Sequence, residues 1–305
     1  MENPRALYPI RAISEMTGVH PVTLRAWERR YGLIRPHRTA KGHRLYSEDD
    51  IQLIHRVVAL LEQGVPVSQV RQHLGQSEPA QAESATPTPS DYWHNALQKM
   101  LNAIIRFDPQ RLDATYNDAL ALYPVDVVTH HLLTPLLKVL GERWTEVDAG
   151  IAEEHFFGTY MRNKLGARLH HLTTRAQSGP TLVAACLPGE QHELGLLLFS
   201  IAAMEQGFGV VLLGANMPLD QIILVAERSA ADGIVLSGSI IQDEKTFHAR
   251  LAQLVETTGV PVFVGGHVAL SALDTIRRAG AHALGLPIPS AVELIRDTIE
   301  ENVEA

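Results

Sequence analysis

His192 stands in a sequence setting that could support metal chemistry. Glu190 precedes it by two residues, Gly195 follows it by three, and an apolar helical pattern begins directly afterwards. An imidazole at the mouth of a helix can be a solvated surface residue, a packed core residue or a metal ligand. A ligating histidine needs an acceptor for its other ring nitrogen, and Glu190 is close enough in sequence to supply one. We therefore treat His192 as a candidate metal ligand and Glu190 as its partner.

Two motifs of small residues follow this histidine along the chain, Ser237 with Ser239 and Gly265 with Gly266. Each motif comes at the end of a short apolar run, and in this part of the chain five such runs alternate with amphipathic stretches. The alternation predicts a doubly wound parallel sheet with helices on both faces. Such sheets bind ligands beyond the carboxyl ends of their strands, so the motifs and the histidine would meet at that edge.

The spacing of these residues resembles the cobalamin-binding Rossmann-like fold over about residues 180–304, although Asp is commoner there than Glu190. The resemblance implies that cobalamin is bound with its lower base displaced, and that His192 takes the place of that base on cobalt. Glu190 would accept the second ring proton, and Gly195 would let the nucleotide tail pass close to the helix backbone. The tail would also pass the small residues at the next two strand ends, Ser237, Ser239, Gly265 and Gly266.

Trp144 and the pair Glu154 and His155 form a second motif, with nine residues between the tryptophan and the pair. Helical periodicity predicts a bundle of four helices in this part of the chain, near residues 92–106, 109–122, 125–142 and 151–175, with the tryptophan just after the third and the pair at the start of the fourth. By themselves they would be a core tryptophan and a solvated polar pair. The spacing resembles that of the cobalamin photoreceptor regulators of the CarH/LitR type. In that family the tryptophan lies beside the 5′-deoxyadenosyl group of adenosylcobalamin, and the Glu-His pair lines the pocket.

Thr145 is a departure from that family. In its light-sensing members, the residue after the tryptophan is a histidine that ligates cobalt after photolysis. Threonine is a poor ligand for Co(III), so a second imidazole would have to come from elsewhere, for example from His155. The resemblance therefore implies cobalamin binding more directly than it implies light sensing.

The first 75 residues are basic, although the chain as a whole is acidic. They hold 11 Lys and Arg against 7 Asp and Glu, a net charge of +4, whereas the remainder carries −12. A basic head indicates a polyanionic partner, and composition alone does not separate DNA from RNA or from an acidic protein. The pattern predicts a helix over 9–17, a second helix from Pro21, a hairpin wing over 35–47 and an amphipathic helix from Glu48.

These elements resemble the winged helix-turn-helix of the MerR regulator family. The matching positions, in order, are Thr23, Leu24, Arg25, Trp27, Glu28, Gly32, Leu33, Pro36, Arg38, Gly42, Arg44 and Tyr46. The resemblance implies that the second helix enters the major groove of double-stranded DNA and that the wing holds the phosphate backbone. The residues expected to contact DNA are Thr23, Arg25, Arg29, Arg38, Lys41, His43, Arg44 and Tyr46.

The fold class that follows is multidomain. We expect an all-α head of winged helix-turn-helix type over 1–75, a flexible linker over 76–91, a four-helix bundle over 92–178 and an α/β Rossmann-like, flavodoxin-like domain over 179–305. The single cysteine excludes an internal disulfide, no apolar run has the length of a membrane span, and the N-terminus lacks a signal-peptide pattern. These features favour a cytoplasmic protein without a membrane partner.

The leading hypothesis is a DNA-binding transcriptional regulator that uses adenosylcobalamin to sense light, acts as a repressor and assembles as a dimer or tetramer on its operator. A second hypothesis keeps DNA binding without light sensing, under the control of cobalamin or of a partner protein. A third is a corrinoid methyl carrier, against which the DNA-reading head argues. The chain has no Ser-His-Asp grouping or phosphate loop of the kind that would indicate an enzyme.

Overall fold

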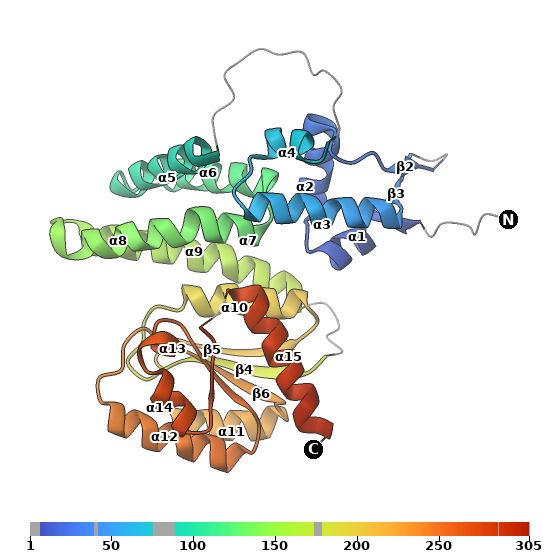
Figure 1. The fold of residues 1–305 in the computed structure, drawn as a ribbon. Coiled ribbons are helices and arrows are strands. Elements are labelled where there is room, and N and C mark those ends of the chain that lie inside the picture. Colours follow the sequence, from blue (N-terminus) through green and yellow to red (C-terminus); the bar gives the residue numbers. More distant parts are fainter. Residues whose placement is uncertain (1–6, 40–41, 76–88, 174–178, 286, 305) are drawn as a thin grey trace. The chain divides into compact units, whose positions relative to one another are not determined.

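The computed structural model in Figure 1 describes residues 7–39, 42–75, 89–173, 179–285 and 287–304. The chain divides into two compact units, Met1–Phe157 and Gly158–Ala305, and each is described by itself below. The division falls inside one long helix, Gly150–Thr173. Most of the expected linker and the predicted DNA contact Lys41 lie outside the described residues.

The head opens the first unit and follows the predicted order of elements. Its helices are α1 (Ile10–Thr17), α2 (Pro21–Ala26), α3 (Glu48–Glu62) and α4 (Val67–His73), and α2 continues into a π-helical turn, η1 (Trp27–Tyr31). The wing consists of β2 (His37–Arg38) and β3 (Arg44–Tyr46), and β1 (Tyr8–Pro9) completes an antiparallel sheet in the order β1-β3-β2. Gly18 ends α1 with φ +67°, and Ser47 forms a capping box with Asp50 at the start of α3.

The rest of the first unit is helical. Its elements are α5 (Pro89–Ile105), α6 (Pro109–Leu122), α7 (Val125–Val128), the π-helical turn η2 (Thr129–Leu133), α8 (Thr134–Glu146) and the start of α9 (Gly150–Thr173). The expected helix over 125–142 is helical throughout, from Val125 to Glu146, but the π-helical turn η2 interrupts its regular α-helical geometry. Pro135 explains the irregularity, because a proline inside a helix removes a backbone hydrogen bond and clashes with the preceding turn.

Within the described part of the second unit, a five-stranded parallel sheet confirms the predicted α/β domain. Its strands are β4 (Thr181–Cys186), β5 (Gly209–Gly214), β6 (Gly233–Ser237), β7 (Val262–Gly265) and β8 (His282–Ala283), in the order β5-β4-β6-β7-β8. Its further helices are α10 (Leu194–Glu205), α11 (Leu219–Ser229), α12 (Glu244–Thr258), α13 (Val268–Ser271), α14 (Leu273–Arg278) and α15 (Ile288–Glu304). The strand order reverses between β4 and β6, which is the point where flavodoxin-like sheets bind ligands.

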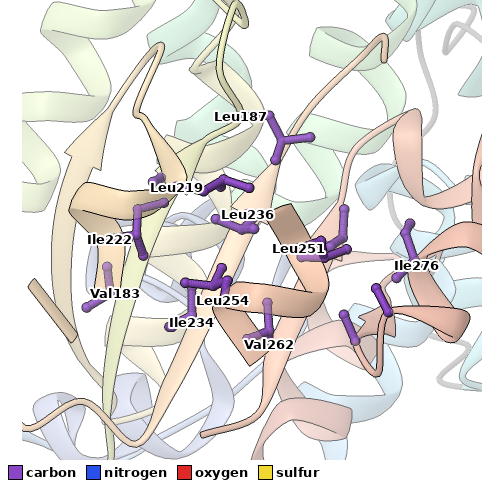
Figure 2. Packing of buried hydrophobic residues seen from close by; sticks show 14 of the residues in the cluster. Val183, Leu187, Leu219, Ile222, Ile234, Leu236, Leu251, Leu254, Val262 and Ile276 are labelled. Atoms are coloured by element: carbon purple, nitrogen blue, oxygen red, sulfur yellow. The ribbon is translucent and has the colours of Figure 1, made fainter. Parts of the chain in front are cut away.

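Apolar side chains bury both faces of this sheet. On one face Val183 and Ile234 pack with residues of α11, α12 and α14, as Figure 2 shows. On the other face Leu182 and Val235 pack with residues of α10 and α15. Successive strand residues point to opposite faces, so continuous apolar strands fill both layers and the polar motifs remain at the strand ends. Across the described residues, no helix combines the length and the hydropathy that a bilayer span requires.

Candidate functional site

His192 lies at the carboxyl edge of the sheet, in the loop between β4 and α10. Its ring nitrogen Nδ1 is 2.7 Å from Oε1 of Glu190, and its backbone N–H donates to the same oxygen at 2.7 Å. The other carboxylate oxygen, Oε2, accepts from the backbone N–H of Ser239 at 2.6 Å, in the loop after β6. Only 7% of the glutamate side chain is exposed, against 64% of the imidazole. The buried carboxylate therefore joins two strand ends and orients an exposed ring.

The protonation of Glu190 suits this role. Burial opposes its ionisation, but hydrogen bonds from His192 and Ser239 outweigh burial, so the pKa of Glu190 lies below its ordinary value of 4.5. The carboxylate is therefore ionised at neutral pH and favours a proton on Nδ1 of the imidazole. The tautomer that results carries its lone pair on Nε2, which is the nitrogen a metal would take.

Asn216, in the loop after β5, adds a third strand end to this network. Its backbone N–H donates to the carbonyl oxygen of Glu190 at 2.9 Å, and its Oδ1 accepts from the backbone N–H of Gly189 at 2.7 Å. The asparagine has φ +53°, a left-handed conformation that Asn adopts more readily than most residues. The loop that carries Glu190 is therefore held from both neighbouring strands.

The glycines of the predicted site differ in whether the backbone around them would accept a side chain. A Cβ at Gly195 would meet no atom within 4 Å, so there is open space beside the start of α10. Gly266 has φ +78°, and a Cβ there would lie 2.4 Å from the carbonyl oxygen of Gly238. The nearest atoms to a Cβ at Gly265 would lie at 3.9 Å. The backbone therefore requires glycine at Gly266, whereas Gly195 leaves room that a ligand could occupy.

The strand register brings the remaining motif residues to neighbouring strand ends. Ser237, the last residue of β6, pairs with Cys186 of β4 and with Gly265 of β7. Burial, aided by the negative charge of Glu190, raises the pKa of the Cys186 thiol to about 12. The cysteine is therefore inert at neutral pH, and the serines are the better candidates for polar contact with a ligand.

Trp144, Glu154 and His155 belong to the first unit, at the turn between α8 and α9. Trp144 is 49% exposed, Glu154 is half-buried and His155 is exposed. A bidentate ion pair crosses this turn, with Arg143 Nε 2.7 Å from Glu153 Oε2 and Nη2 2.9 Å from Oε1. Glu153 is buried, and its hydrogen bonds raise the pKa of Arg143. In the sequence, Arg143 directly precedes Trp144, and Glu153 directly precedes Glu154 and His155.

Four of the residues predicted to contact DNA are exposed in the described part of the head, and one of them, Arg38, is ion-paired with Glu28. Arg25 lies on α2, Arg29 lies on η1, and His43 lies in the wing. Exposed arginines on a recognition helix can donate to base edges in the major groove or to phosphates. The side chains at these positions are therefore accessible to DNA, as their predicted role requires.

The two predicted wing arginines are ion-paired with Glu28 of η1. Arg38 Nη2 lies 2.6 Å from Oε1 of the glutamate, and Arg44 Nε binds Oε2. Burial opposes the ionisation of Glu28, but hydrogen bonds from Arg44 and Arg38 outweigh burial and lower its pKa. The glutamate therefore fastens the recognition helix to both wing strands, and the arginines serve the fold of the wing as well as any contact with DNA.

Two other predicted DNA contacts are buried. Thr23 is 1% exposed, and its hydroxyl donates to the carbonyl oxygen of Leu120 at 3.1 Å. The Trp27 indole donates to the carbonyl oxygen of Leu122 at 2.8 Å, so both bonds attach the head to the end of α6 within the first unit. Burial raises the pKa of Tyr46 to about 12. In this conformation neither Thr23 nor Tyr46 presents its hydroxyl to a phosphate.

Sequence reasoning misses several residues that build these sites. Asn216 lies in a Gly-Ala-Asn-Met-Pro stretch after an apolar strand, and this composition marks a turn that could have identified it. Arg143 and Glu153 are ten residues apart on different helices, so no local helical spacing identifies them as partners. Glu28 is part of the head motif, but its motif position does not reveal that it binds two wing residues.

Three family models match successive parts of the chain. The model described as the MerR HTH family regulatory protein matches residues 8–77. Two models described as B12 binding domains match residues 96–169 and 180–286. Their order follows that of the head, the helical bundle and the parallel sheet.

Two proteins of Myxococcus xanthus are similar to this chain over most of their length. The HTH-type transcriptional repressor CarH is 31% identical over 283 residues, which cover 90% of this chain and 94% of that protein. The HTH-type transcriptional repressor CarA is 29% identical over 275 residues, which cover 89% of this chain and 91% of that protein. Among solved structures, the monomethylamine corrinoid protein of Methanosarcina barkeri aligns with a TM-score of 0.54 at 19% identity, over 67% of this chain and 98% of that one. That last likeness supports the fold.

Proposed function

Because the chain belongs to the MerR-type helix-turn-helix regulators that carry B12-binding domains, we propose that it is a cobalamin-dependent transcriptional repressor that responds to light. It is a regulator and not an enzyme. The bound form in this proposal is adenosylcobalamin, the partner is a double-stranded DNA operator, and the place of action is the cytoplasm.

The geometry of Glu190 and His192 carries the proposal. A buried carboxylate fixes Nδ1 of the imidazole at 2.7 Å, so Nε2 of the exposed ring would be the nitrogen that coordinates cobalt. The carboxylate is itself fixed by the backbone N–H of Ser239, so the orientation of the ring does not depend on a second flexible side chain. His192 would hold cobalt from below, and the open space at Gly195 fits a nucleotide tail that passes the start of α10. The tail would be lined by Ser237, Ser239, Gly265 and Gly266.

The helical bundle would recognise the organic group above the corrin ring. When bound, adenosylcobalamin supplies a cobalt–carbon bond that light can break. Trp144 offers a half-exposed indole on which an adenine ring can stack, and Glu154 and His155 offer polar groups for hydrogen bonds. Because Thr145 replaces the histidine of light-sensing family members, His155 is the candidate for a second imidazole near cobalt.

The head would bind DNA through its basic surface. Exposed arginines on α2 and η1 would reach the major groove, and the wing fixed by Glu28 would rest on the phosphate backbone. Several heads joined in a dimer or tetramer would bind tandem half-sites at high effective concentration, so loss of the oligomer in light would release the DNA. Of the residues expected to contact DNA, we propose Arg25, Arg29, Arg38, Lys41, His43 and Arg44 for this role, whereas the buried Thr23 and Tyr46 would serve the fold of the head.

A regulator that senses cobalamin without light is the second candidate, and Thr145 is the observation that favours it. In that case occupancy of the His192 site alone would set the oligomeric state. Trp144, Glu154 and His155 would then distinguish forms of cobalamin and would not report on photolysis. The two candidates share cobalamin and DNA binding and differ only in the response to illumination.

Full-length protein loaded with adenosylcobalamin in the dark tests these proposals. A duplex selected by this protein from a randomised library serves as the operator. We expect a retarded duplex and an oligomer by light scattering in darkness, and the loss of both after green light. Equal DNA binding in darkness and light would contradict the light response and leave the cobalamin sensor. An absorption spectrum without retained corrinoid after gel filtration would contradict cobalamin dependence altogether.

A further inference from the structure

The turn between α8 and α9 exposes large apolar side chains. Trp144 near the end of α8 is 49% exposed, Val147 in the turn is 36% exposed, and Ile151 at the start of α9 is 54% exposed. Large apolar residues that gather on a surface generally mark a place where something apolar binds. The turn therefore offers a binding surface and not a part of the hydrophobic core.

The backbone of this turn is closely packed and is bridged by an ion pair. The carbonyl oxygen of Arg143 accepts from the backbone N–H of Val147 at 3.1 Å, and a Cβ at Gly150 would lie only 2.2 Å from the same oxygen. The Glu153 carboxylate is buried and binds two guanidinium nitrogens of Arg143. Apolar residues of similar volume often stabilise a fold as well as a buried ion pair does, so the bidentate pair is better explained by the orientation it imposes.

We propose that Arg143 and Glu153 are positioning residues that fix Trp144 for recognition of the organic group on the upper face of the bound corrinoid. Arg143 directly precedes Trp144, and Glu153 directly precedes Glu154 and His155. One ion pair thus sets the separation of the two parts of the motif. The inference rests on the proposed cobalamin binding and deepens it, because it assigns selectivity for the upper group to a pair that does not itself touch it.

The first test measures selectivity. The double variant R143M/E153M keeps side-chain volume and leaves no unpaired buried charge. Its matched control, R168M/E205M, removes an ion pair between α9 and α10 in the second unit. Dissociation constants of the full-length proteins for adenosylcobalamin and methylcobalamin are measured in the dark by absorption. We expect R143M/E153M to lose about 10-fold in affinity for adenosylcobalamin, with a change below about 2-fold for methylcobalamin, and the control to keep the wild-type preference.

The second test needs no corrinoid. The fluorescence of Trp144 is obtained as the difference between each protein and its counterpart with Trp144→Phe, and its quenching by acrylamide is measured. We expect quenching of Trp144 to change in R143M/E153M and to stay unchanged in R168M/E205M. If R143M/E153M does not fold by circular dichroism, Glu153→Gln, which preserves shape, takes its place.

An unchanged preference for adenosylcobalamin over methylcobalamin, or an equal loss of affinity for both, would overturn the proposal. If the wild-type protein binds neither corrinoid, the proposed function fails at that point. In that case the acrylamide quenching of Trp144 tests the positioning role of Arg143 and Glu153 by itself. If this quenching is the same in R143M/E153M as in the wild type, the positioning role is overturned too.

Discussion

The sheet edge around His192 and the DNA-reading head are each organised by one glutamate whose side chain is largely shielded from solvent. Glu190 joins the loops after β4 and β6, and Glu28 joins η1 to the wing strands β2 and β3. In both cases hydrogen bonds outweigh burial and lower the pKa of the carboxyl group. The partners differ, because Glu190 leaves the imidazole that we propose as a cobalt ligand exposed, whereas Glu28 binds the guanidinium groups that are predicted to hold DNA.

Some motif residues are therefore exposed to a ligand, whereas others hold the fold together. At the sheet edge the predicted ligand is oriented by its neighbour and remains accessible. In the head, several residues with the spacing of a DNA-binding family hold the wing in place or attach the head to α6. Motif spacing therefore predicts candidate members of a site, and the structure shows which of these side chains are exposed.

The largest expected effect comes from His192→Ala, which removes the exposed group of the first region. Because even the loss of a hydrogen-bonding partner of a metal ligand costs about 10- to 100-fold in affinity, loss of the ligand itself should cost at least about 100-fold, nearly 3 kcal/mol. Titration of the full-length protein with adenosylcobalamin in the dark measures this change. His248→Ala, on α12, is the control and should bind as wild type does. Equal affinity in all three proteins would show that the imidazole does not hold cobalt.

The sequence predicts the sheet edge more completely than the head for a physical reason. The Glu190–His192 contact joins residues two apart after a strand, and parallel strands bring their carboxyl ends together without further information. The burial of Thr23 depends on the carbonyl oxygen of Leu120, which is 97 positions away. Side-chain contacts at such separations follow from packing between helices, and no local pattern encodes them.

The π-helical turn η2 and the turn between α8 and α9 also depend on features that a local sequence pattern encodes poorly. The pattern predicts a regular third bundle helix, and Pro135 is the signal that could have indicated the π-helical turn within it. No comparable signal exists for the Arg143–Glu153 pair, since the two residues share neither a helix nor a periodic spacing. The sequence thus identifies Trp144 as a motif residue but not the ion pair beside it.

Two glycine variants test whether Gly266 serves the backbone of the sheet edge and Gly195 leaves room for a ligand. Gly266→Ala forces a left-handed backbone on alanine and places its Cβ against Gly238, so it should reduce the free energy of unfolding by about 2 kcal/mol. Gly195→Ala fills open space at a helix start and should leave stability equal or raise it by about 0.5 kcal/mol. Only the second variant should weaken cobalamin binding without a loss of stability. Urea unfolding and corrinoid titration of both variants give the two measurements, and identical behaviour would contradict the distinction.

Glu190→Gln and Glu28→Gln test whether the two glutamates support the fold in the same way. A carboxyl whose pKa is lower in the folded state stabilises the fold above its unfolded pKa, and that support is lost as the pH falls through the folded pKa. The wild-type free energy of unfolding should therefore fall below about pH 4.5, and each variant should show less of this dependence. Each should also lose about 1–2 kcal/mol near neutral pH.

Urea unfolding between about pH 3 and pH 7 measures both effects, with Glu300→Gln on the exposed side of α15 as the control. Only Glu190→Gln should also weaken cobalamin binding, because Glu28 lies in the head. A pH dependence that neither variant alters would contradict the role given to the two carboxylates.

The smallest expected effect concerns Thr23 and tests whether a predicted DNA contact serves the fold instead. Thr23→Val keeps the β-branched shape but removes the hydrogen bond to Leu120, so it should cost about 1 kcal/mol of unfolding free energy without lowering DNA affinity. Arg25→Ala, on the exposed side of the same helix, should do the reverse: DNA affinity falls about 10-fold and stability stays within about 0.5 kcal/mol. Binding to the selected duplex and urea unfolding are measured for both variants. If Thr23→Val instead weakens DNA binding and reduces its salt dependence, the hydroxyl leaves α6 to meet a phosphate, and the buried conformation is only the DNA-free state of the head.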